Sequence, residues 1–377
     1  LELLAKTLRP LPFGKEEITA EGERVVHSGF SNLETRYRQR YADLAVNPPV
    51  REVFEGRAGI IRELRSYLDQ RGFLEVETPI LQPLYGGAFA RPFTTYHNDL
   101  DADLYLRIAD ELYLKRLIVG SLDRVYEIGK NFRNEGIDRT HSPEFTMLEL
   151  YQAFADYEDM MELAEGMIAT AVGNVLGKTE VEYGGERIEL APPWRRMTYR
   201  EALLQYGGVD ALESDTEALR REVQADGRAD AKVLPREKLL EVLFSARVEP
   251  ELRKPTIVHD YPIEISPLAK PKRGEPRLAE RFEVIAAGCE LVNAFSELND
   301  PLDQWERFAD QARAREDGDL EAQPLDEDYL RALEYGLPPT GGLGLGVDRL
   351  VMLATGSASI RDVTLFPALR PGEGVEA

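Results

Sequence analysis

Hydrophobic residues recur at helical spacing between residues 50 and 70, at Val53, Ile60, Ile61, Leu64 and Leu68. This spacing places them on one face of an amphipathic helix. Gly72 is typical of a helix end, and the β-rich run Phe73–Val76 follows it. The same periodicity predicts further helices over Asp110–Gly120, Asp156–Leu176, parts of Asp215–Val248, Leu302–Arg315 and Val347–Ala354.

The segments with strand character group into two hairpins, Arg124–Ile128 with Phe145–Tyr151 and Arg281–Ala287 with Glu290–Glu297. A polar loop, Asn134–Pro143, joins the first pair, and Gly288 supplies the turn of the second. The opening segment Leu1–Ala5 is expected to form a short apolar strand before an aperiodic polar stretch. The pattern therefore predicts an α+β chain with antiparallel strands and a helical module between the hairpins.

The composition limits the class of protein. The chain has 377 residues, 43% hydrophobic and 30% charged, which indicates a globular protein, and no apolar run is long enough to cross a membrane. It begins at Leu1, and its first twelve residues lack the features of a signal peptide, so we expect it to start inside a longer polypeptide or after trimming. The single cysteine, Cys289, excludes an intramolecular disulfide framework and a Cys-rich zinc site, and fits a reducing cytoplasm.

The net charge of −22 argues against a nucleic-acid partner, because phosphate binding needs clustered Lys and Arg. Two local basic stretches keep the question open. The first contains Arg36, Arg38 and Arg40, and the second contains Lys270, Lys272 and Arg273. Charge alone is equally compatible with a solvated surface there. The sequence has no G-x-x-x-x-G-K-[ST] phosphate loop, no H-E-x-x-H zinc helix and no G-x-S-x-G elbow. A dinucleotide-binding fingerprint is also disfavoured, because the spacing is wrong at Gly342, Gly344 and Gly346.

Ionisable and aromatic residues share faces of two strands. Because alternate residues of a strand point the same way, the first hairpin presents together Phe145, Met147, Glu149 and Tyr151. The second hairpin presents Asn293, Phe295 and Glu297. A lone carboxylate is more often a surface residue, but carboxylates beside aromatic rings on two strands need a cation or a hydrogen-bond partner. The pattern therefore predicts a site for a cationic ligand.

A second group of residues has the chemistry to hold a nucleotide. Arg133, a polar loop, His141 and Phe145 supply cations for a triphosphate and a ring for a purine. Arg349, beside glycines at the start of the last helix, is a second candidate phosphate clamp. Glu283 and Glu290 offer hard oxygen ligands for Mg²⁺. Simple alternation along the hairpin would point them to opposite faces of the sheet, so a bulge is needed to turn both to one face. Taken singly, each of these residues is also compatible with a surface ion pair.

Three segments resemble the motifs of class II aminoacyl-tRNA synthetases in order and separation: Gly72–Pro79, Phe132–Phe145 (which opens Phe-Arg-Asn-Glu) and Gly344–Leu350. Four others resemble lysyl-tRNA synthetases in particular: Arg36–Tyr41, Gly86–Phe93, Glu111–Arg116 and Phe295–Asp300. The resemblance covers nearly all of Leu1–Pro371. It implies an antiparallel sheet flanked by helices, with a helical insertion between the second and third motifs at about residues 198–252.

The same resemblance implies a domain order and a set of partners. Residues 31–377 would form the catalytic domain, and residues 1–30 the end of an OB-fold anticodon-binding domain and a linker, with the rest of that domain outside this chain. The first motif would build a homodimer. The substrates would be ATP, L-lysine and tRNA(Lys), the cofactor Mg²⁺, and the location the cytoplasm, with no membrane partner.

The family's binding residues match positions of this chain one by one. For lysine, the resemblance assigns the α-ammonium to Glu111 and the backbone of Gly87, the carboxylate to Arg133 and Asn293, the ε-ammonium to Glu297 and Tyr151, and the rest of the pocket to Glu149 and Phe295. For ATP, it assigns the catalytic phosphate clamp to Arg133 and Arg349, triphosphate contact to His141, adenine stacking to Phe145, further ATP contacts to Glu135 and Glu283, and Mg²⁺ to Glu283 and Glu290.

The implied reaction is attack of the lysine carboxylate on the α-phosphorus of ATP, which gives lysyl-adenylate and pyrophosphate, followed by transfer to the terminal ribose of tRNA. It needs positioning and cations rather than a side-chain nucleophile. The chain departs from the family at Asp110, Ser142 and Ala294, and in a longer linker at Phe13–Phe30, without losing a residue assigned to catalysis.

Three alternatives stay open. A lysine ligase that acts on elongation factor P is disfavoured by the strand expected at Leu1–Ala5 and by the basic run after Glu34. A non-catalytic synthetase paralogue is disfavoured by the intact set Arg133, Glu283, Glu290 and Arg349. An aspartate or asparagine enzyme is disfavoured because the charge of Glu297 would repel an acidic side chain.

Overall fold

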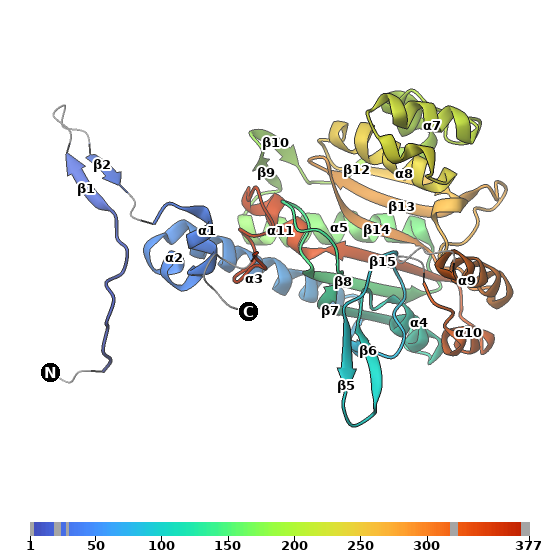
Figure 1. The fold of residues 1–377 in the computed structure, drawn as a ribbon, viewed down its shortest axis with the longest axis horizontal. Coiled ribbons are helices and arrows are strands. Elements are labelled where there is room, and N and C mark those ends of the chain that lie inside the picture. The colour runs from blue at the N-terminus through green and yellow to red at the C-terminus, as the bar shows by residue number, and fades with distance from the viewer. Residues whose placement is uncertain (1–3, 19–23, 28–29, 317–322, 371–377) are drawn as a thin grey trace.

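The computed structural model describes residues 4–18, 24–27, 30–316 and 323–370 and is built around an eight-stranded sheet (Figure 1). The strand order is β11-β12-β13-β14-β15-β8-β7-β3. In chain order these strands are β3 (Leu74–Glu75), β7 (Arg124–Phe132), β8 (Glu144–Ala153), β11 (Arg195–Thr198), β12 (Thr256–Pro262), β13 (Leu278–Ala286), β14 (Cys289–Ser296) and β15 (Thr340–Gly346). The predicted α+β class is confirmed, and both predicted hairpins are present as β7–β8 and β13–β14. The sheet is antiparallel except at its outer pairs, β11–β12 and β3–β7, which are parallel and were not predicted.

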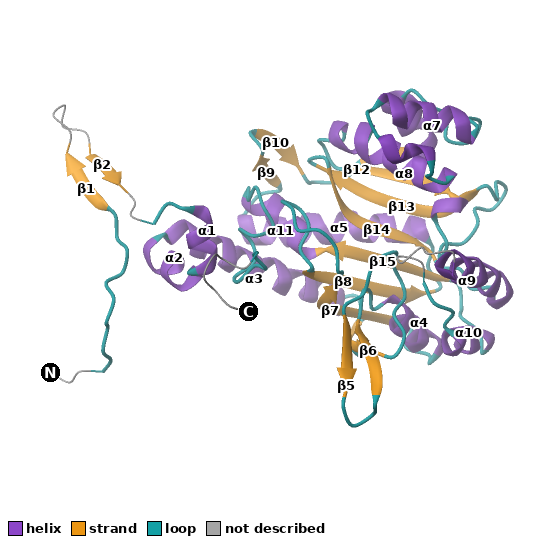
Figure 2. Cartoon of the chain, viewed as in Figure 1, coloured by secondary structure: helices purple, strands orange, loops and turns teal. Residues whose placement is uncertain are grey.

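Helices cover the sheet, as Figure 2 shows. Their bounds are α1 (Leu33–Arg38), α2 (Arg40–Val46), α3 (Pro48–Asp69), α4 (Glu111–Val119), α5 (Tyr157–Leu176), α6 (Tyr199–Ala202), α7 (Thr216–Ala225), α8 (Arg236–Arg247), α9 (Pro301–Glu316), α10 (Glu327–Glu334) and α11 (Val347–Thr355). Helices α6, α7 and α8 lie between β11 and β12 in the chain and enclose a small apolar core of their own with part of β12. The predicted helices are therefore present, within a few residues of the expected ends.

Local sequence explains where several helices begin and end. Helix α3 starts with prolines at its first positions, where a missing N–H costs nothing, and Gly72 beyond its end takes a left-handed φ of 75°. Asp156 caps α5 by accepting hydrogen bonds from the first-turn amides. Asp110 stands at the predicted N-cap of α4, but its side chain accepts from Asn131 Nδ2 at 3.2 Å instead of capping the helix.

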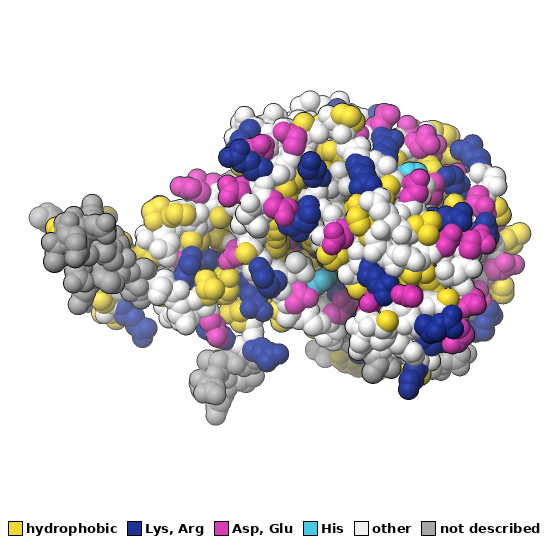
Figure 3. Space-filling view, turned by 90° about the horizontal axis from the view of Figure 1, so that it is seen from above, with side chains coloured by type: hydrophobic (Ala, Val, Ile, Leu, Met, Phe, Trp, Pro, Cys, Tyr) yellow, Lys and Arg dark blue, Asp and Glu magenta, His cyan; other side chains and the backbone are white. Residues whose placement is uncertain are grey.

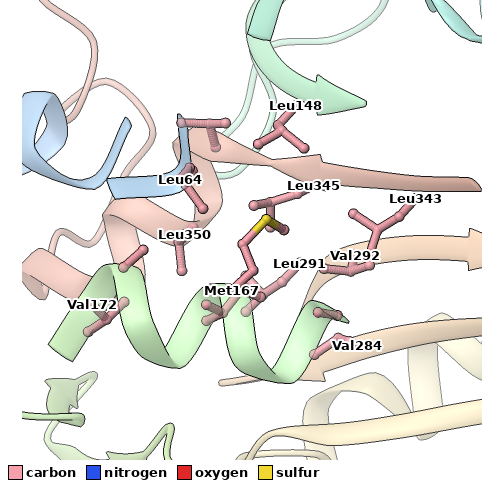
Figure 4. Close-up of a cluster of buried hydrophobic side chains, with 14 of the residues drawn as sticks. Leu64, Leu148, Met167, Val172, Val284, Leu291, Val292, Leu343, Leu345 and Leu350 are labelled. Carbon is pink, nitrogen blue, oxygen red and sulfur yellow. The ribbon is translucent and has the colours of Figure 1, made fainter. Parts of the chain in front are cut away.

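One face of the sheet is the main apolar core, packed against α3, α5 and α11 (Figure 4). Alternation decides which residues reach it: Leu148 and Leu150 of β8 and Leu343 and Leu345 of β15 are all buried there. Each fully buried leucine of this kind contributes about 1.5–3 kcal/mol. The intervening residues of the same strands point to the opposite face, which leaves that face free to form a site.

Three smaller sheets complete the fold. They are β1 (Lys15–Ile18) with β2 (Arg24–His27), β4 (Leu81–Gln82) with β6 (Ala102–Leu106) and β5 (Thr94–His97), and β9 (Glu180–Tyr183) with β10 (Glu186–Glu189). The strand predicted at Leu1–Ala5 is wrong for its described part, because Leu4 and Ala5 lie outside any strand and Leu4 is 89% exposed; residues 1–3 lie outside the described residues.

A buried carboxylate, Asp348, ties three distant segments together. Its Oδ2 accepts from the backbone N–H of Thr146 on β8 at 2.7 Å, and its Oδ1 accepts from Arg57 of α3 at 2.5 Å. Arg57 also donates to the hydroxyl of Thr146 at 2.9 Å. Because the aspartate is almost fully buried and fully hydrogen-bonded, it fixes α3, β8 and the start of α11 to one another.

Of the two basic stretches considered as possible nucleic-acid contacts, the first has structural partners throughout, whereas in the second Lys272 pairs with Asp260 and Arg273 is 82% exposed. Arg40 is 1% exposed and donates to Asp43 and to backbone carbonyls near residue 365, so it is neither a solvated residue nor a phosphate contact. Arg36 and Arg38 pair with Asp43 and Glu34. Acidic and basic side chains are interspersed over the face shown in Figure 3. Within the described residues, no helix has the length and apolar content needed to cross a membrane.

Candidate active site

A cavity of about 410 Å³ opens on the face of the sheet opposite the main core. Every residue assigned to the site from sequence lines it except Glu297, which lies directly behind its wall at Gly342. A volume in this range suits a small organic ligand. The structure thus brings the residues predicted for the cationic ligand and those predicted for the nucleotide to one place, although their individual roles stay predictions.

Strand register arranges the floor of the cavity in rows that cross the sheet. One row joins Tyr151, Gly342 and Phe295, and the next joins Glu149, Gly344, Asn293 and Glu283. The glycines of β15 stand between functional side chains of β8 and β14. A Cβ added to Gly342 would lie 1.9 Å from Oε1 of Glu297 and 2.6 Å from the ring of Tyr151, so only glycine fits there.

The acidic end of the cavity is built from Glu111 of α4 and Glu297 at the end of β14. Both are buried, and both are paired with the ammonium of Lys115, which lies 2.5 Å from Glu111 Oε1 and also bonds Glu297 Oε2. Burial raises the pKa of both carboxyl groups, although Lys115 opposes that effect. Sequence reasoning gave Lys115 no role, although its spacing four residues after Glu111 was a signal that the two side chains meet.

Glu149 and Tyr151 complete this end of the cavity. The Tyr151 hydroxyl donates to Glu149 Oε2 at 3.2 Å, and both residues are buried. Burial, together with the nearby Asp110, raises the pKa of Glu149 well above its usual value. Burial likewise raises the pKa of Tyr151, so its hydroxyl stays protonated and can donate or accept a hydrogen bond.

Arg281 was not predicted as part of the site, yet it orients two residues that were. Its Nε donates to Asn293 Oδ1 at 3.0 Å, which turns the amide nitrogen of Asn293 away and leaves it available to an acceptor. It also donates to Glu283 Oε1 at 2.7 Å, and Tyr261 donates to the other oxygen of Glu283 at 2.9 Å. Arg281 stands two residues before Glu283 on the same strand face, and that parity was the available signal.

Arg133 is a cation of the site with a donor that is not hydrogen-bonded. Its Nε is buried and has no hydrogen-bond partner among the described residues, and its guanidinium lies 5.1 Å from the ring centre of Phe145. Burial lowers the pKa of Arg133, although Glu135, Glu290 and Glu149 oppose that effect. A buried guanidinium short of acceptors is poised to bind an anion such as a carboxylate or a phosphate.

Arg349 and His141 lie next to each other in the cavity, and a carboxylate holds each of them in place. Arg349 donates to Glu290 Oε2 at 3.2 Å, and its other terminal nitrogen lies 3.1 Å from His141 Nε2. The opposite ring nitrogen of His141 lies 2.8 Å from Asp138. Burial would raise the pKa of Asp138, but hydrogen bonds from Thr140 and His141 hold it at about 2. The loop between β7 and β8 is thereby connected to the start of α11.

The hairpin β13–β14 contains the bulge that the parity of Glu283 and Glu290 required. Register shifts between Val284 and Ile285, so that Glu290 pairs with Ile285 and both carboxylates line the cavity. Burial, reinforced by repulsion from Glu290, raises the pKa of Glu283 to about 7. A bound divalent cation would relieve that repulsion. Within the described residues, no group of three or more His, Cys, Asp or Glu side chains forms a metal cage, so a cation held here would complete its ligands from elsewhere.

The backbone near Gly87 closes the side of the cavity. Its N–H donates to Gln323 Oε1 at 3.0 Å, and the glycine has a φ of 87° that only glycine adopts easily. An ammonium is a donor and needs an acceptor, so the carbonyl of Gly87 is the backbone group suited to the role predicted for this residue. Gln323 was not predicted as part of the site.

The cavity on the largely antiparallel sheet has two arginines at one end and buried carboxylates at the other, and comparison with known proteins identifies the class of protein to which such a site belongs. Residues 32–370 match the family of class II tRNA synthetases for aspartate, lysine and asparagine (D, K and N), and the chain belongs to that family. The lysine–tRNA ligase of Moorella thermoacetica is 55% identical over 99% of this chain and 74% of its own length. The lysine–tRNA ligases of Pelotomaculum thermopropionicum and Roseiflexus castenholzii are 55% and 56% identical, over 99% and 92% of this chain and 72% and 71% of theirs.

The first prediction concerns the glycine row. Gly342→Ala places a methyl group where Glu297 and Tyr151 lie, so we expect amino-acid-dependent ATP–pyrophosphate exchange to fall roughly 100-fold or more in kcat/KM for the amino acid. The matched control is Gly56→Ala on α3, where the added methyl makes an ordinary 3.6 Å contact with Thr355. Gly56→Ala should keep its activity. Wild-type kinetics in Gly342→Ala would contradict the described packing.

Proposed function

We propose that this chain activates lysine with ATP and transfers the lysyl group to tRNA(Lys). The observation that supports lysine most directly is a pair of buried carboxylates, Glu111 and Glu297, each with one oxygen directed toward the cavity. Lys115 is one cation shared by these two carboxylates, and a substrate with two ammonium groups would supply each of them with a cation of its own. The identity of 53–56% to several lysine–tRNA ligases, over almost the whole chain, points the same way.

The substrate is oriented by its three charged groups. Glu111 and the carbonyl of Gly87 receive the α-ammonium, while Glu297 and the Tyr151 hydroxyl receive the ε-ammonium. The stem of the side chain lies against Phe295, and Glu149 supports the Tyr151 hydroxyl from beside it. Arg133 and the amide of Asn293 hold the carboxylate, which is the attacking group. Binding all three charged groups at once fixes the carboxylate toward the nucleotide, and such positioning lowers the barrier to reaction.

The nucleotide lies along the cationic half of the cavity. Phe145 stacks on adenine, His141 and Glu135 contact ATP from the loop between β7 and β8, and Arg133 and Arg349 clamp the phosphates. Negative charge moves toward pyrophosphate as the bond to the α-phosphorus breaks, and guanidinium groups already in place stabilise that charge. Glu283 and Glu290 would hold Mg²⁺, which when bound adds further positive charge beside the phosphates.

The rival substrates are weighed by charge and by identity. The charge of Glu297 would repel the side chain of aspartate. The side chain of asparagine is neutral and has no cation to pair with Glu297. The case against the elongation-factor-P rival loses two arguments, because no strand exists at Leu4–Ala5 and the basic run is engaged in structural pairs. The matched relatives are lysine–tRNA ligases, and the match covers 74% and 72% of the length of two of them, which favours tRNA as the acceptor.

The experiment that tests the function compares the acceptors. Wild-type protein with ATP and labelled lysine should charge tRNA(Lys) and leave elongation factor P unlabelled. Because an anticodon-binding module improves tRNA affinity without supplying chemistry, the assay should use the full-length protein and this chain side by side. Preferential labelling of elongation factor P by both would overturn the proposal.

A second prediction concerns the phosphate clamp. Arg133→Ala and Arg349→Ala should each lower lysine-dependent ATP–pyrophosphate exchange by roughly 100- to 1000-fold in kcat, because the lost cation acts on charge that develops in the transition state. The control is Arg187→Ala at an exposed position of β10. Thermal unfolding should show both variants folded. Near-normal exchange in either one would remove that arginine from the mechanism.

A third prediction concerns the choice of lysine. Glu297→Gln keeps the shape of the side chain and removes its charge, so kcat/KM for lysine should fall by a factor equivalent to about 2–4 kcal/mol. The affinity for ATP should change little. Glu306→Gln at an exposed position of α9 serves as the control. If Glu297→Gln activates lysine normally, or loses ATP affinity equally, the residue does not read the lysine side chain.

We further propose that the protein is a homodimer, that residues 31–377 form its catalytic domain with an insertion at about residues 198–252, and that it works in the cytoplasm. The dimer has structural support at the edge of the sheet. Edge strand β3 has only two residues, and exposed apolar side chains line a hollow beside it at Leu74, Leu122 and Phe154. Exposed apolar groups at a sheet edge are typical of a surface covered by a partner.

The fourth prediction tests that interface. Sedimentation equilibrium at micromolar concentration should show a dimer for the wild type, and Leu74→Asp should shift it toward monomer, because a buried unpaired charge opposes association. Leu302→Asp on α9, a leucine that is 77% exposed, is the control and should stay dimeric. A monomeric wild type that is fully active would contradict the proposed assembly.

A further inference from the structure

Lys115 of α4 is a fully buried lysine, with 0% of its side chain exposed. Its ammonium lies between two carboxylates that the proposed function assigns to opposite ends of the substrate. It is 2.5 Å from Glu111 Oε1 and is paired with Glu297 Oε2. Burial alone would lower the pKa of Lys115, but the two carboxylates raise it well above its usual value, so the group is a permanent cation.

The two carboxylates divide their oxygens in the same way. Each gives one oxygen to Lys115 and directs the other to the cavity. Oε1 of Glu297 lies beneath Gly342 and has no hydrogen-bond partner among the described residues. Oε2 of Glu111 lies 3.8 Å from the position that a Cβ on Gly87 would take, at the wall of the cavity. Lys115 therefore determines which oxygen of each carboxylate is available to a ligand.

The surroundings of Lys115 resemble those of the proposed substrate ammonium. Its Nζ lies 6.0, 5.7 and 5.9 Å from the ring centres of Tyr151, Phe295 and Tyr329, within reach of cation–π attraction. Two interpretations follow. Lys115 either occupies the substrate's place and must leave, or stays and prepares the carboxylates. Because α4 holds it beneath the cavity and the free oxygens still face the cavity, the geometry favours the second.

We propose that Lys115 is a positioning residue for lysine selection, a built-in counter-ion that aims one oxygen of Glu111 at the α-ammonium and one oxygen of Glu297 at the ε-ammonium. This inference rests on the proposed function and deepens it. By bridging the two carboxylates, a single side chain sets the distance between the two ammonium sites, and hence the length of side chain that the pocket accepts. Ornithine, one methylene shorter, should therefore be activated more weakly than lysine.

Removing Lys115 also changes the pH at which the site works. Among the described residues, the titratable groups that act on Glu297 and Lys115 are Glu111 from α4, Tyr151 from β8 and Tyr329 from α10, while Asp110 and Glu149 act on the neighbouring Tyr151. Burial raises the pKa of Glu297 to about 8 even though Lys115 lowers it. Without Lys115 the pKa of Glu297 rises further, so the anion that binds the ε-ammonium forms only at higher pH.

The test compares Lys115→Met with Arg116→Met, which removes a cation from the same helix but one that pairs with Asp326 and Asp328 rather than with the pocket. ATP–pyrophosphate exchange is measured from about pH 6.5 to about 10, because a shift of about one pH unit from a pKa of about 8 places the midpoint of the variant at about 9. For Lys115→Met we expect the KM for lysine at pH 7.5 to rise at least about tenfold. The midpoint of 1/KM should shift upward by at least about one pH unit, with the KM for ATP within about twofold of wild type. Arg116→Met should keep the wild-type profile.

An unchanged or lower KM for lysine in Lys115→Met overturns the inference, and a lower value supports displacement of Lys115 by the substrate. If Lys115→Met fails to fold, Lys115→Gln keeps one donor and should give a smaller shift of the same sign, and no shift overturns the inference. A structure of the wild type with lysine bound should retain both pairs of Lys115, and a displaced Lys115 would contradict the proposal. If the wild type itself fails to use lysine, the proposed function falls; if it uses lysine while Lys115→Met behaves like Arg116→Met, only this inference does.

Discussion

The absence of side chains from the cavity face of β15, at Gly342 and Gly344, is the constraint on which the rest of the site depends. Strands β8, β15 and β14 lie side by side, and the outer two direct acidic, amide and aromatic side chains toward the same face. Any residue larger than glycine at Gly342 would occupy the space of Glu297 and Tyr151. On the other face of β15, Leu343 and Leu345 anchor the strand in the main core. Because alternate residues of a strand point to opposite faces, the leucines of β15 pack in the core while its glycines leave space for a ligand in the cavity.

Electrostatics then divides the cavity into two halves. The end near α4 collects Glu111, Glu149 and Glu297, with Lys115 as an internal counter-charge, and burial raises the pKa of each of these carboxyl groups. The end near α11 collects Arg133 and Arg349. An amino acid with a cationic side chain and a nucleotide with an anionic tail match this division, and the carboxylate of one meets the phosphates of the other at the boundary. The hydrogen bonds of Asp348 hold this arrangement in place by joining α3, β8 and α11.

Sequence reasoning recovered the parts of the fold that periodicity controls. The long helices, the two central hairpins and the bulge required by Glu283 and Glu290 are all present. It missed β15 as a strand, because a glycine-rich segment has low β-propensity and is held as a strand by its neighbours β8 and β14. The expected strand at Leu1–Ala5 was wrong in its described part, because Leu4 and Ala5 pair with no strand among the described residues.

The candidate site was predictable where a motif named its residues and unpredictable where burial decides the role. Arg40 looked like a surface cation and is buried among backbone carbonyls, whereas Lys115 looked like an ordinary helix lysine and lies between two pocket carboxylates. Such roles depend on which elements pack together, and one sequence does not reveal that. The central claim, that paired buried carboxylates make this a lysine-activating site, is tested most directly by ATP–pyrophosphate exchange on the unmodified protein with lysine, aspartate and asparagine supplied separately. The account predicts that kcat/KM for lysine exceeds that for either rival by at least roughly 100-fold, and equal or faster exchange with aspartate or asparagine would contradict it.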